Sequence, residues 1–265
     1  VGMSQSMVKP KKLKSLQKTL ASEKSRVLLV VDECHRIGAE GKAPLCELSP
    51  ESALGLSATP EVYGNPAGTN RILELFSGKD GSVVHKFTLK EALDKGILCP
   101  FYYHIETVHL TKEEQKRYDS LRDKMKWAWI KYLESNQQED YDKWFELVCQ
   151  SRLIIRGASE KIQAMKSFIQ EYYDEGHRWI VYCDTIEMVD KANREIRGLG
   201  MGIIPLIYHS EMDDFSKEQV LKAFARDGGV LIAIRCLDEG INIESISHGI
   251  ILSSTTNPRE FIQRR

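Results

Sequence analysis

Short apolar runs that alternate with amphipathic segments are the feature of this sequence that most limits its fold. From residue 158 onward, helical patterns span 158–174, 187–199 and 216–225, and apolar runs span 179–183, 203–208, 230–234 and 249–253. Strands that are separated by helices of this length pair in parallel through right-handed crossovers. This half of the chain is therefore predicted to be α/β, with a parallel sheet flanked by helices.

An earlier apolar run leads directly into two acidic residues. The unbroken Val-Leu-Leu-Val-Val run predicts a buried strand over 26–31, and the tetrad Asp32-Glu33-Cys34-His35 follows it. Parallel sheets bind ligands at the carboxyl ends of their strands. An acid there can hold magnesium on a nucleoside triphosphate, and a neighbouring carboxylate can deprotonate the attacking water. For an isolated acidic pair, however, the commoner interpretation is a strand that ends in solvated charges.

Further segments follow the tetrad in a recognisable order. The segment Leu56-Ser57-Ala58-Thr59-Pro60 also follows an apolar run. The later segments are Ile180-Val181-Tyr182-Cys183-Asp184, Arg235-Cys236-Leu237-Asp238-Glu239-Gly240-Ile241-Asn242 and Asn257-Pro258-Arg259-Glu260-Phe261-Ile262-Gln263-Arg264-Arg265. With the tetrad, they resemble motifs II, III, IV, V and the start of VI of the superfamily 2 helicases and translocases of DExH type. Residues 87–100 are similar to the crossover between the motor domains of restriction and repair translocases.

The resemblance implies two RecA-like domains, each with a parallel sheet flanked by helices. Residues 1–100 would be the C-terminal part of the first, ATP-binding domain, which would be incomplete. Residues 101–265 would be the second domain, with a helical insertion over about 111–150, ending within motif VI. The phosphate-binding pattern Gly-x-x-x-x-Gly-Lys-Ser/Thr does not occur in the sequence, and the family's arginine fingers would follow Arg265. We therefore expect a segment that is truncated at both ends and inactive on its own.

The resemblance assigns catalytic roles to Asp32, Glu33, His35 and Gln263. Asp32 would hold magnesium, normally through a water molecule, and Glu33 would be the base that activates the hydrolytic water. His35 would report the state of the γ-phosphate to motif III, although a histidine at a strand end is more often simply exposed to water. Gln263 would reach the γ-phosphate side. The implied cofactors are ATP and magnesium.

A wider set of residues is implied for nucleotide binding. Hydroxyl hydrogen bonds from Ser57 and Thr59 would couple the state of ATP to the grip on nucleic acid, and ordinary helix capping is the alternative for both. Gly240, beside two acids, would allow close backbone approach to a ligand. The complete set is Asp32, Glu33, Ser57, Thr59, Asp238, Glu239, Gly240, Gln263 and Arg264.

The function that the resemblance implies is an ATP-dependent helicase or translocase acting on DNA. Hydrolysis in the cleft between the two domains would drive movement along a strand. Other subunits or fused domains of a restriction or repair system are the expected partners. RNA is the alternative substrate, and a nucleic-acid clamp that binds without hydrolysis is the alternative class of protein. The candidate contacts with nucleic acid are the loops at 4–6, 184–185, 209–210 and 255–256.

A long helical segment leaves two interpretations open. Residues 111–150 contain no glycine or proline, and apolar and aromatic residues recur there at helical spacing. The favoured interpretation is a pair of amphipathic helices that packs on the second domain. The alternative is a basic, aromatic face that touches DNA through Lys124, Lys126, Trp127 and Lys131. The lysines over 9–18 are expected to form a solvated helix face.

The composition adds few constraints on location or ligand. A formal net charge of −1 gives no overall basic field, so contact with nucleic acid would need a local groove. The six cysteines form no Cys-x-x-Cys pair, which argues against a zinc or redox site. No signal peptide and no membrane-spanning apolar stretch is present. We therefore expect a cytoplasmic or nucleoid-associated protein that has no contact with membranes.

Local signals predict the remaining elements. A helix is expected over 11–22, and another over 88–95, where Thr88 and Glu91 form a capping box and Gly96 ends the helix. Short strands are expected over 83–87 and, from alternating polarity, over 102–110. No regular element is expected in the polar, glycine-rich stretch 64–81.

Overall fold

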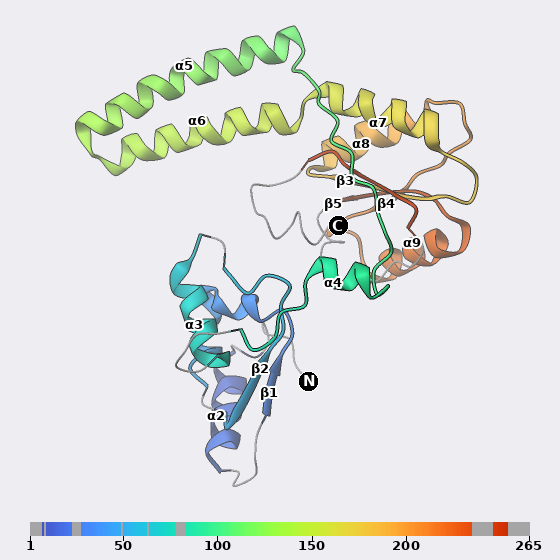
Figure 1. Cartoon of the computed structure of the whole chain (residues 1–265). Coiled ribbons are helices and arrows are strands. Elements are labelled where there is room, and N and C mark those ends of the chain that lie inside the picture. The colour runs from blue at the N-terminus through green and yellow to red at the C-terminus, as the bar shows by residue number, and fades with distance from the viewer. Residues whose placement is uncertain are drawn as a thin grey trace. The chain divides into compact units, whose positions relative to one another are not determined.

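The computed structural model describes residues 7, 9–22, 28–48, 50–62, 64–77, 83–234 and 246–253. The chain forms two compact units, Val1–Tyr103 and His104–Arg265. Figure 1 shows the helices and strands of both units. Within the described part of the chain, no helix is both long and apolar enough to cross a membrane.

The first unit is built on a pair of parallel strands. Its elements are α2 (Pro10–Ser22), β1 (Leu28–Val31), the short 3-10 helices η1 (Cys34–Gly38) and η2 (Glu40–Leu45), β2 (Ser52–Gly55), α3 (Pro66–Phe76) and α4 (Leu89–Asp94). The register pairs Leu28 with Ser52 and Val31 with Gly55. A small core of buried residues from η1, η2 and the following turn packs against α2 and α3. The two strands thus end at the same edge.

The second unit is a four-stranded parallel sheet with helices on both faces. Its elements are α5 (Lys112–Ser135), α6 (Gln138–Arg156), α7 (Ser159–Tyr172), β3 (Arg178–Cys183), α8 (Ile186–Arg197), β4 (Leu206–Tyr208), α9 (Asp214–Asp227), β5 (Gly229–Ile234) and β6 (His248–Ile251). The strand order is β4-β5-β3-β6. Alternate residues of β3 and β5 pack on α7 and α8 on one face and on α9 on the other. This architecture confirms the predicted α/β class.

Helices α5 and α6 form a long hairpin, here called the arm, which extends away from the sheet of the second unit (Figure 1). The hairpin is held by aromatic rings that meet between its helices, with centroids of Trp129 and Trp144 4.7 Å apart. Near the tip, Lys131 Nζ lies 2.6 Å from Asp140 Oδ1, and the hydroxyl of Ser135 donates to the other oxygen of Asp140 at 2.6 Å. The arm therefore has its own stabilising contacts.

Three sequence predictions need correction. Residues 102–110 are extended but pair with no strand among the described residues, and 83–87 likewise form no strand. Alternating polarity indicates an extended backbone but does not supply a hydrogen-bonding partner. The stretch expected to lack regular structure contains α3, whose start is capped by Asn65 and has Pro66 as its first residue. Both are recognised helix-start signals that outweigh the nearby glycine.

The capping box of α4 is confirmed. The backbone N–H of Glu91 donates to Thr88 Oγ1 at 3.2 Å, and the backbone N–H of Thr88 donates to Glu91 Oε2 at 2.7 Å. The helix ends before Gly96, whose φ of 66° lies in the left-handed region. Glycine adopts this conformation without a Cβ clash, which explains why the helix stops there.

Candidate functional site

The carboxyl ends of β1 and β2 hold two loops side by side. The backbone N–H of Leu56 donates to the carbonyl of Val31 at 2.9 Å, and the N–H of Cys34 donates to the carbonyl of Leu56 at 2.9 Å. The pairing of the chain therefore continues beyond the strands themselves. As a result, the Asp32-Glu33 pair lies beside the Leu56-Ser57 segment, at the sheet edge where the sequence placed both.

Glu33 has a backbone conformation that is unusual for a residue with a side chain. Its φ of 48° and ψ of 49° lie in the left-handed region, which costs roughly 1–2 kcal/mol for an L-residue. Among the described residues, Asn136 is the only other non-glycine with positive φ. The turn leads from β1 into η1, and the N–H of Glu33 donates to Asp32 Oδ1 at 2.9 Å. Backbone strain of this kind clusters at functional sites.

A buried histidine connects the two loops. His35 is only 3% exposed. Its Nδ1 lies 2.9 Å from Ser57 Oγ and 3.1 Å from Glu33 Oε2. The backbone N–H of Thr59 donates to the same Ser57 oxygen at 3.2 Å. Glu33, His35, Ser57 and Thr59 therefore form one polar network.

Nδ1 of His35 faces both the Ser57 hydroxyl and the Glu33 carboxylate. A proton on Nδ1 would let it donate to either oxygen, whereas a bare Nδ1 would accept from the Ser57 hydroxyl. The Glu33 side chain is about one-third exposed, at 33%, so it can still meet a ligand or water. The orientation of a partly exposed carboxylate is thus tied to a serine on the neighbouring loop.

Asp32 lies next to this network and is exposed. Among the described residues, no three His, Cys, Asp or Glu side chains gather to hold a metal ion. Magnesium is commonly bound by one or two carboxylates together with water and phosphate oxygens. The oxygen donors of Asp32 and Glu33 fit a cation that arrives with a phosphate-bearing ligand.

Cys34 lies on the buried side of the tetrad and is no candidate nucleophile. Burial is the main cause that raises the pKa of its thiol, and the charge of Glu33 raises it further. The nucleophilic form of cysteine is the thiolate, which a raised pKa disfavours. Cys34 therefore has a packing role.

Helix α3, which the sequence analysis did not predict, packs against η1. The Arg71 guanidinium donates from Nη2 to the carbonyl of Gly38 at 2.7 Å. A Cβ atom added at Gly38 would lie 2.6 Å from Ile72 Cδ1 and 2.7 Å from the carbonyl oxygen of Gly68. The close approach of two backbones thus requires glycine in η1, and this packing holds the helical turn that carries His35.

We expect Gly38→Ala to destabilise the first unit by about 1–3 kcal/mol, because overpacking against a backbone atom forces the two elements apart. The measurement is chemical denaturation followed by circular dichroism. Gly41→Ala is the matched control, since an added Cβ at Gly41 meets nothing within 4 Å. Equal stability of the two variants would show that α3 does not hold η1 in place.

Several predicted site residues lie outside the described part of the chain. These residues are Asp238, Glu239, Gly240, Gln263 and Arg264, and the loops 4–6 and 255–256 lie outside it as well. Their predicted roles remain predictions.

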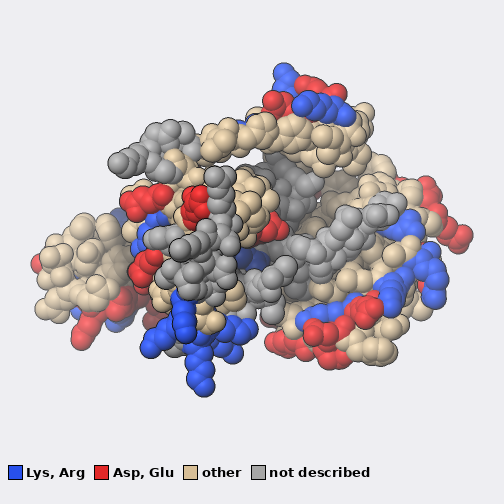
Figure 2. All heavy atoms as spheres, turned by 90° about the horizontal axis from the view of Figure 1, so that it is seen from below, with Lys and Arg blue, Asp and Glu red and all other residues tan. Residues whose placement is uncertain are grey.

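The exposed lysines of α2 lie on the surface of the first unit, and Figure 2 shows basic side chains gathered into a cluster on one face.

The predicted nucleic-acid contact at 184–185 remains a prediction, but the Asp184 side chain is paired within the protein. The Asp184 side chain is only 5% exposed, and its Oδ2 lies 3.2 Å from Nη1 of Arg156. The neighbouring Thr185 caps α8 by accepting from the N–H of Met188 at 3.2 Å. The sequence motif marked the carboxyl end of β3 correctly, but it could not show that a distant arginine neutralises the carboxylate.

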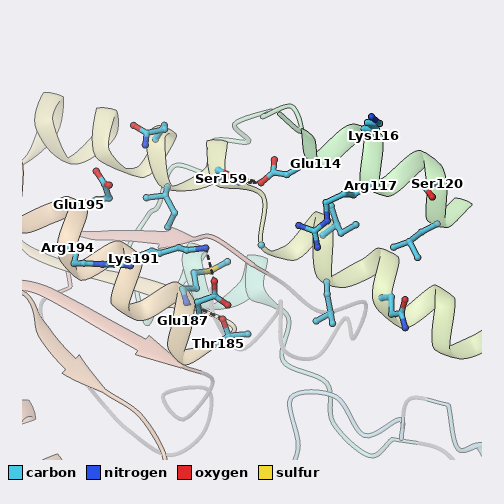
Figure 3. Close-up of a pocket in the computed structure, with 18 of the residues that line it drawn as sticks. Glu114, Lys116, Arg117, Ser120, Ser159, Thr185, Glu187, Lys191, Arg194 and Glu195 are labelled. Carbon is cyan, nitrogen blue, oxygen red and sulfur yellow. Dashed lines mark hydrogen bonds and ion pairs between the residues drawn. The ribbon is translucent and has the colours of Figure 1, made fainter. Parts of the chain in front are cut away.

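A groove of about 1190 Å³ lies within the second unit, between the arm and helices α7 and α8 (Figure 3). The basic side chains that line it are Lys116, Arg117, Lys124, Lys191 and Arg194. Its three acids are engaged: Glu114 accepts hydrogen bonds from Thr111 and Ser159, Glu187 pairs with Lys191 at 2.9 Å, and Glu195 pairs with Lys166 at 2.6 Å. Among the described residues, no carboxylate pairs with Lys116, Arg117 or Lys124. The groove therefore carries an excess of positive charge.

The arm supports both interpretations of its sequence in part. Its aromatic residues mostly pack against one another within the hairpin, whereas the favoured interpretation predicted that the two helices pack on the second domain. Trp127, however, is 70% exposed, and Lys124 lines the groove. Lys131 pairs with Asp140, so it is not a free surface cation.

Comparisons with known proteins agree with these features. Residues 160–265 match the family described as Helicase conserved C-terminal domain, and residues 1–62 match the family described as Type III restriction enzyme, res subunit. Over 257 residues the chain is 28% identical to the DNA 3'-5' translocase XPB2 of Sulfurisphaera tokodaii, covering 89% of this chain and 54% of that protein. The chain thus spans about half the length of this relative.

A solved structure shows the same fold. The Hef helicase domain of Pyrococcus furiosus superposes with a TM-score of 0.54 at 12% sequence identity, covering 99% of this chain and 75% of that chain. At this level of identity the similarity concerns the fold alone.

Proposed function

Because the chain belongs to the superfamily 2 helicases of the restriction and repair branch, we propose that the full-length protein is an ATP-driven translocase that acts on DNA. The observation that carries this proposal is the polar network of Glu33, His35, Ser57 and Thr59 at one sheet edge. Such a network can link a hydrolytic carboxylate to a neighbouring loop. The relative named as a DNA translocase supports DNA rather than RNA as the substrate.

The site residues have distinct roles in this proposal. Bound Mg-ATP supplies the phosphoanhydride bond that is hydrolysed. Asp32, which is exposed, would hold the magnesium of the bound nucleotide. Glu33 orients the attacking water and accepts its proton on a carboxylate oxygen. His35 fixes that carboxylate through Nδ1.

Ser57 and Thr59 transmit the state of the nucleotide in this proposal. Their loop is attached to Glu33 through the buried His35, so displacement of the carboxylate displaces the loop. Asp238, Glu239, Gly240, Gln263 and Arg264 complete the nucleotide site from motifs V and VI. Simple capping does not account for the contact between the Ser57 hydroxyl and the imidazole.

We assign the two compact units to the two motor domains. The unit Val1–Tyr103 corresponds to part of the first RecA-like domain, and His104–Arg265 to the second, with the arm as its helical insertion. The basic groove of the second unit binds the phosphate backbone, which gives affinity with little sequence preference. The protein would work in the cytoplasm or on the nucleoid, with other subunits or fused domains of a restriction or repair system.

The test is ATP hydrolysis by the full-length protein, followed as phosphate release with duplex DNA, single-stranded DNA or RNA of matched length. DNA should stimulate hydrolysis at least about tenfold, whereas RNA should have a smaller effect. Magnesium removal by a chelator should abolish turnover, and added magnesium should restore it. DNA binding without any hydrolysis would instead identify a nucleic-acid clamp, and stronger stimulation by RNA would identify an RNA helicase.

A further inference from the structure

A single carboxylate caps two helices at the root of the arm, which is the end where α5 begins and where α6 leads into α7. Glu114, in the first turn of α5, accepts the backbone N–H of Thr111 on Oε2 at 2.9 Å. Its other oxygen accepts both the backbone N–H of Ser159 at 3.0 Å and the Ser159 hydroxyl. Figure 3 shows this contact beside the groove. Hydrogen bonds from Ser159 and Thr111 outweigh burial and lower the pKa of Glu114 to about 2, so the carboxylate remains ionised at neutral pH.

A second polar contact connects the end of α6, at the root of the arm, to the sheet. Arg156 is the last residue of α6, and Asp184 directly follows β3. Their ion pair spans 3.2 Å, with the carboxylate almost completely buried. Lys161 of α7 is close by and donates from Nζ to the carbonyl of Arg156 at 3.3 Å. Arg156 thus contacts the buried carboxylate through its guanidinium and Lys161 through its carbonyl.

These two polar contacts hold the arm in place, because little apolar packing does so. No residue of α5 is buried, and the basic groove separates the arm from α8. Only Gly157 and Ala158 connect α6 to α7. The orientation of the arm, and with it the width of the groove, therefore depends on the polar contacts at its root.

We propose that Glu114, Arg156 and Asp184 are positioning residues that lock the arm to the carboxyl end of β3, and thereby hold the groove in the form that binds the nucleic-acid backbone. This inference rests on the proposed function of the groove. It assigns to Asp184 a role in anchoring the arm in place of direct contact with the nucleic acid. The arm and the sheet of the second unit then move as one body during the motor cycle.

The position of Lys161 predicts an order among variants. Burial lowers the pKa of Lys161, Asp184 raises it and Arg156 lowers it. Removing the carboxylate by Asp184→Asn leaves two neighbouring cations that repel each other. Removing the arginine by Arg156→Gln leaves the carboxylate beside Lys161, which can compensate. Asp184→Asn should therefore be the more damaging change, and adding Arg156→Gln to it should cause no further loss.

The experiment measures binding of a labelled DNA duplex to the full-length protein, together with ATP hydrolysis in the absence of DNA. Asp184→Asn should raise the dissociation constant for DNA on the order of tenfold, because an arm that is no longer held in position loses contacts with the phosphate backbone, which supply much of the affinity. Hydrolysis without DNA should stay within about twofold of wild type, a separation that general misfolding would not produce. Hydrogen exchange at residues 157–160 should become faster.

Arg122→Gln is the matched control, since Arg122 forms an ion pair of the same length, 3.2 Å, with Asp119 on the exposed surface of α5. It should leave DNA binding unchanged. If Asp184→Asn does not fold, Arg156→Gln carries the test with a smaller shift of the same kind. Unchanged DNA affinity in the Asp184 and Arg156 variants, or equal loss of DNA binding and DNA-free hydrolysis, would overturn the inference. Failure of wild type to hydrolyse ATP would instead contradict the proposed function, and DNA binding would still test the arm.

Discussion

Glu33→Gln should reduce ATP turnover by the full-length protein by at least about 10²-fold, the range expected when a general base is lost. Glutamine keeps the shape of the side chain and can still accept a hydrogen bond from His35, which lies 3.1 Å from the native carboxylate. It cannot take up the proton of the attacking water. Affinities for nucleotide and DNA should therefore stay close to those of wild type. The measurement is phosphate release at saturating DNA, with nucleotide affinity from titration of a fluorescent ATP analogue.

Glu40→Gln is a suitable control for this change. Glu40 is an exposed glutamate at the start of η2, so the variant removes the same charge from the same unit. It should hydrolyse ATP at the wild-type rate. Near-normal phosphate release by Glu33→Gln would show that Glu33 is not the base, and the tetrad would then need a different assignment.

Asp32→Ala should instead weaken binding of the nucleotide in the presence of magnesium, on the order of ten- to a hundredfold. This is the loss expected from one interaction with a charged group, about 1.5–3 kcal/mol. Asp32 is exposed, and its Oδ1 accepts the N–H of Glu33, so the substitution removes both a cation partner and a support of the strained turn. The measurement is the same titration, carried out with magnesium and with a chelator.

The titration with chelator separates the two roles of Asp32. If Asp32 acts through magnesium, wild type and Asp32→Ala should bind the nucleotide with similar affinity once the metal is removed. Asp32→Asn should help to identify the structural part, because an amide oxygen can still accept the Glu33 N–H. A difference between Asp32→Ala and wild type that persists without magnesium would assign the residue to the turn rather than to the metal.

The order of strands and helices in the second unit follows from local sequence patterns. Unbroken apolar runs such as those of β3 and β5 are buried on both faces, and intervening amphipathic helices leave parallel pairing as the feasible arrangement. The capping box at Thr88 is likewise a contact between residues three positions apart. Such features depend on near neighbours in the chain, so they can be predicted without knowledge of the fold.

The candidate site was predictable in outline for a related reason. Two apolar strands with polar residues directly after them must present those residues at one edge if they pair in parallel, as β1 and β2 do. The prediction did not contain the left-handed turn at Glu33 or the burial of His35. Both depend on η1 being packed against α3, a contact between segments such as Gly38 and Arg71 that lie 33 positions apart in the chain.

Contacts between distant residues account for what the sequence left open. Residues 102–110 have the alternation of a strand, yet the described structure provides no partner for their backbone groups. Asp184 has the position of a surface ligand, yet Arg156, at the end of a helix 28 positions earlier, buries and neutralises it. The chain's patterns determine which segments are helical or extended and which motifs lie at strand ends. Whether a particular charge is free or paired depends on groups that folding brings together, because electrostatic and hydrogen-bond energies depend on distance in space rather than along the sequence.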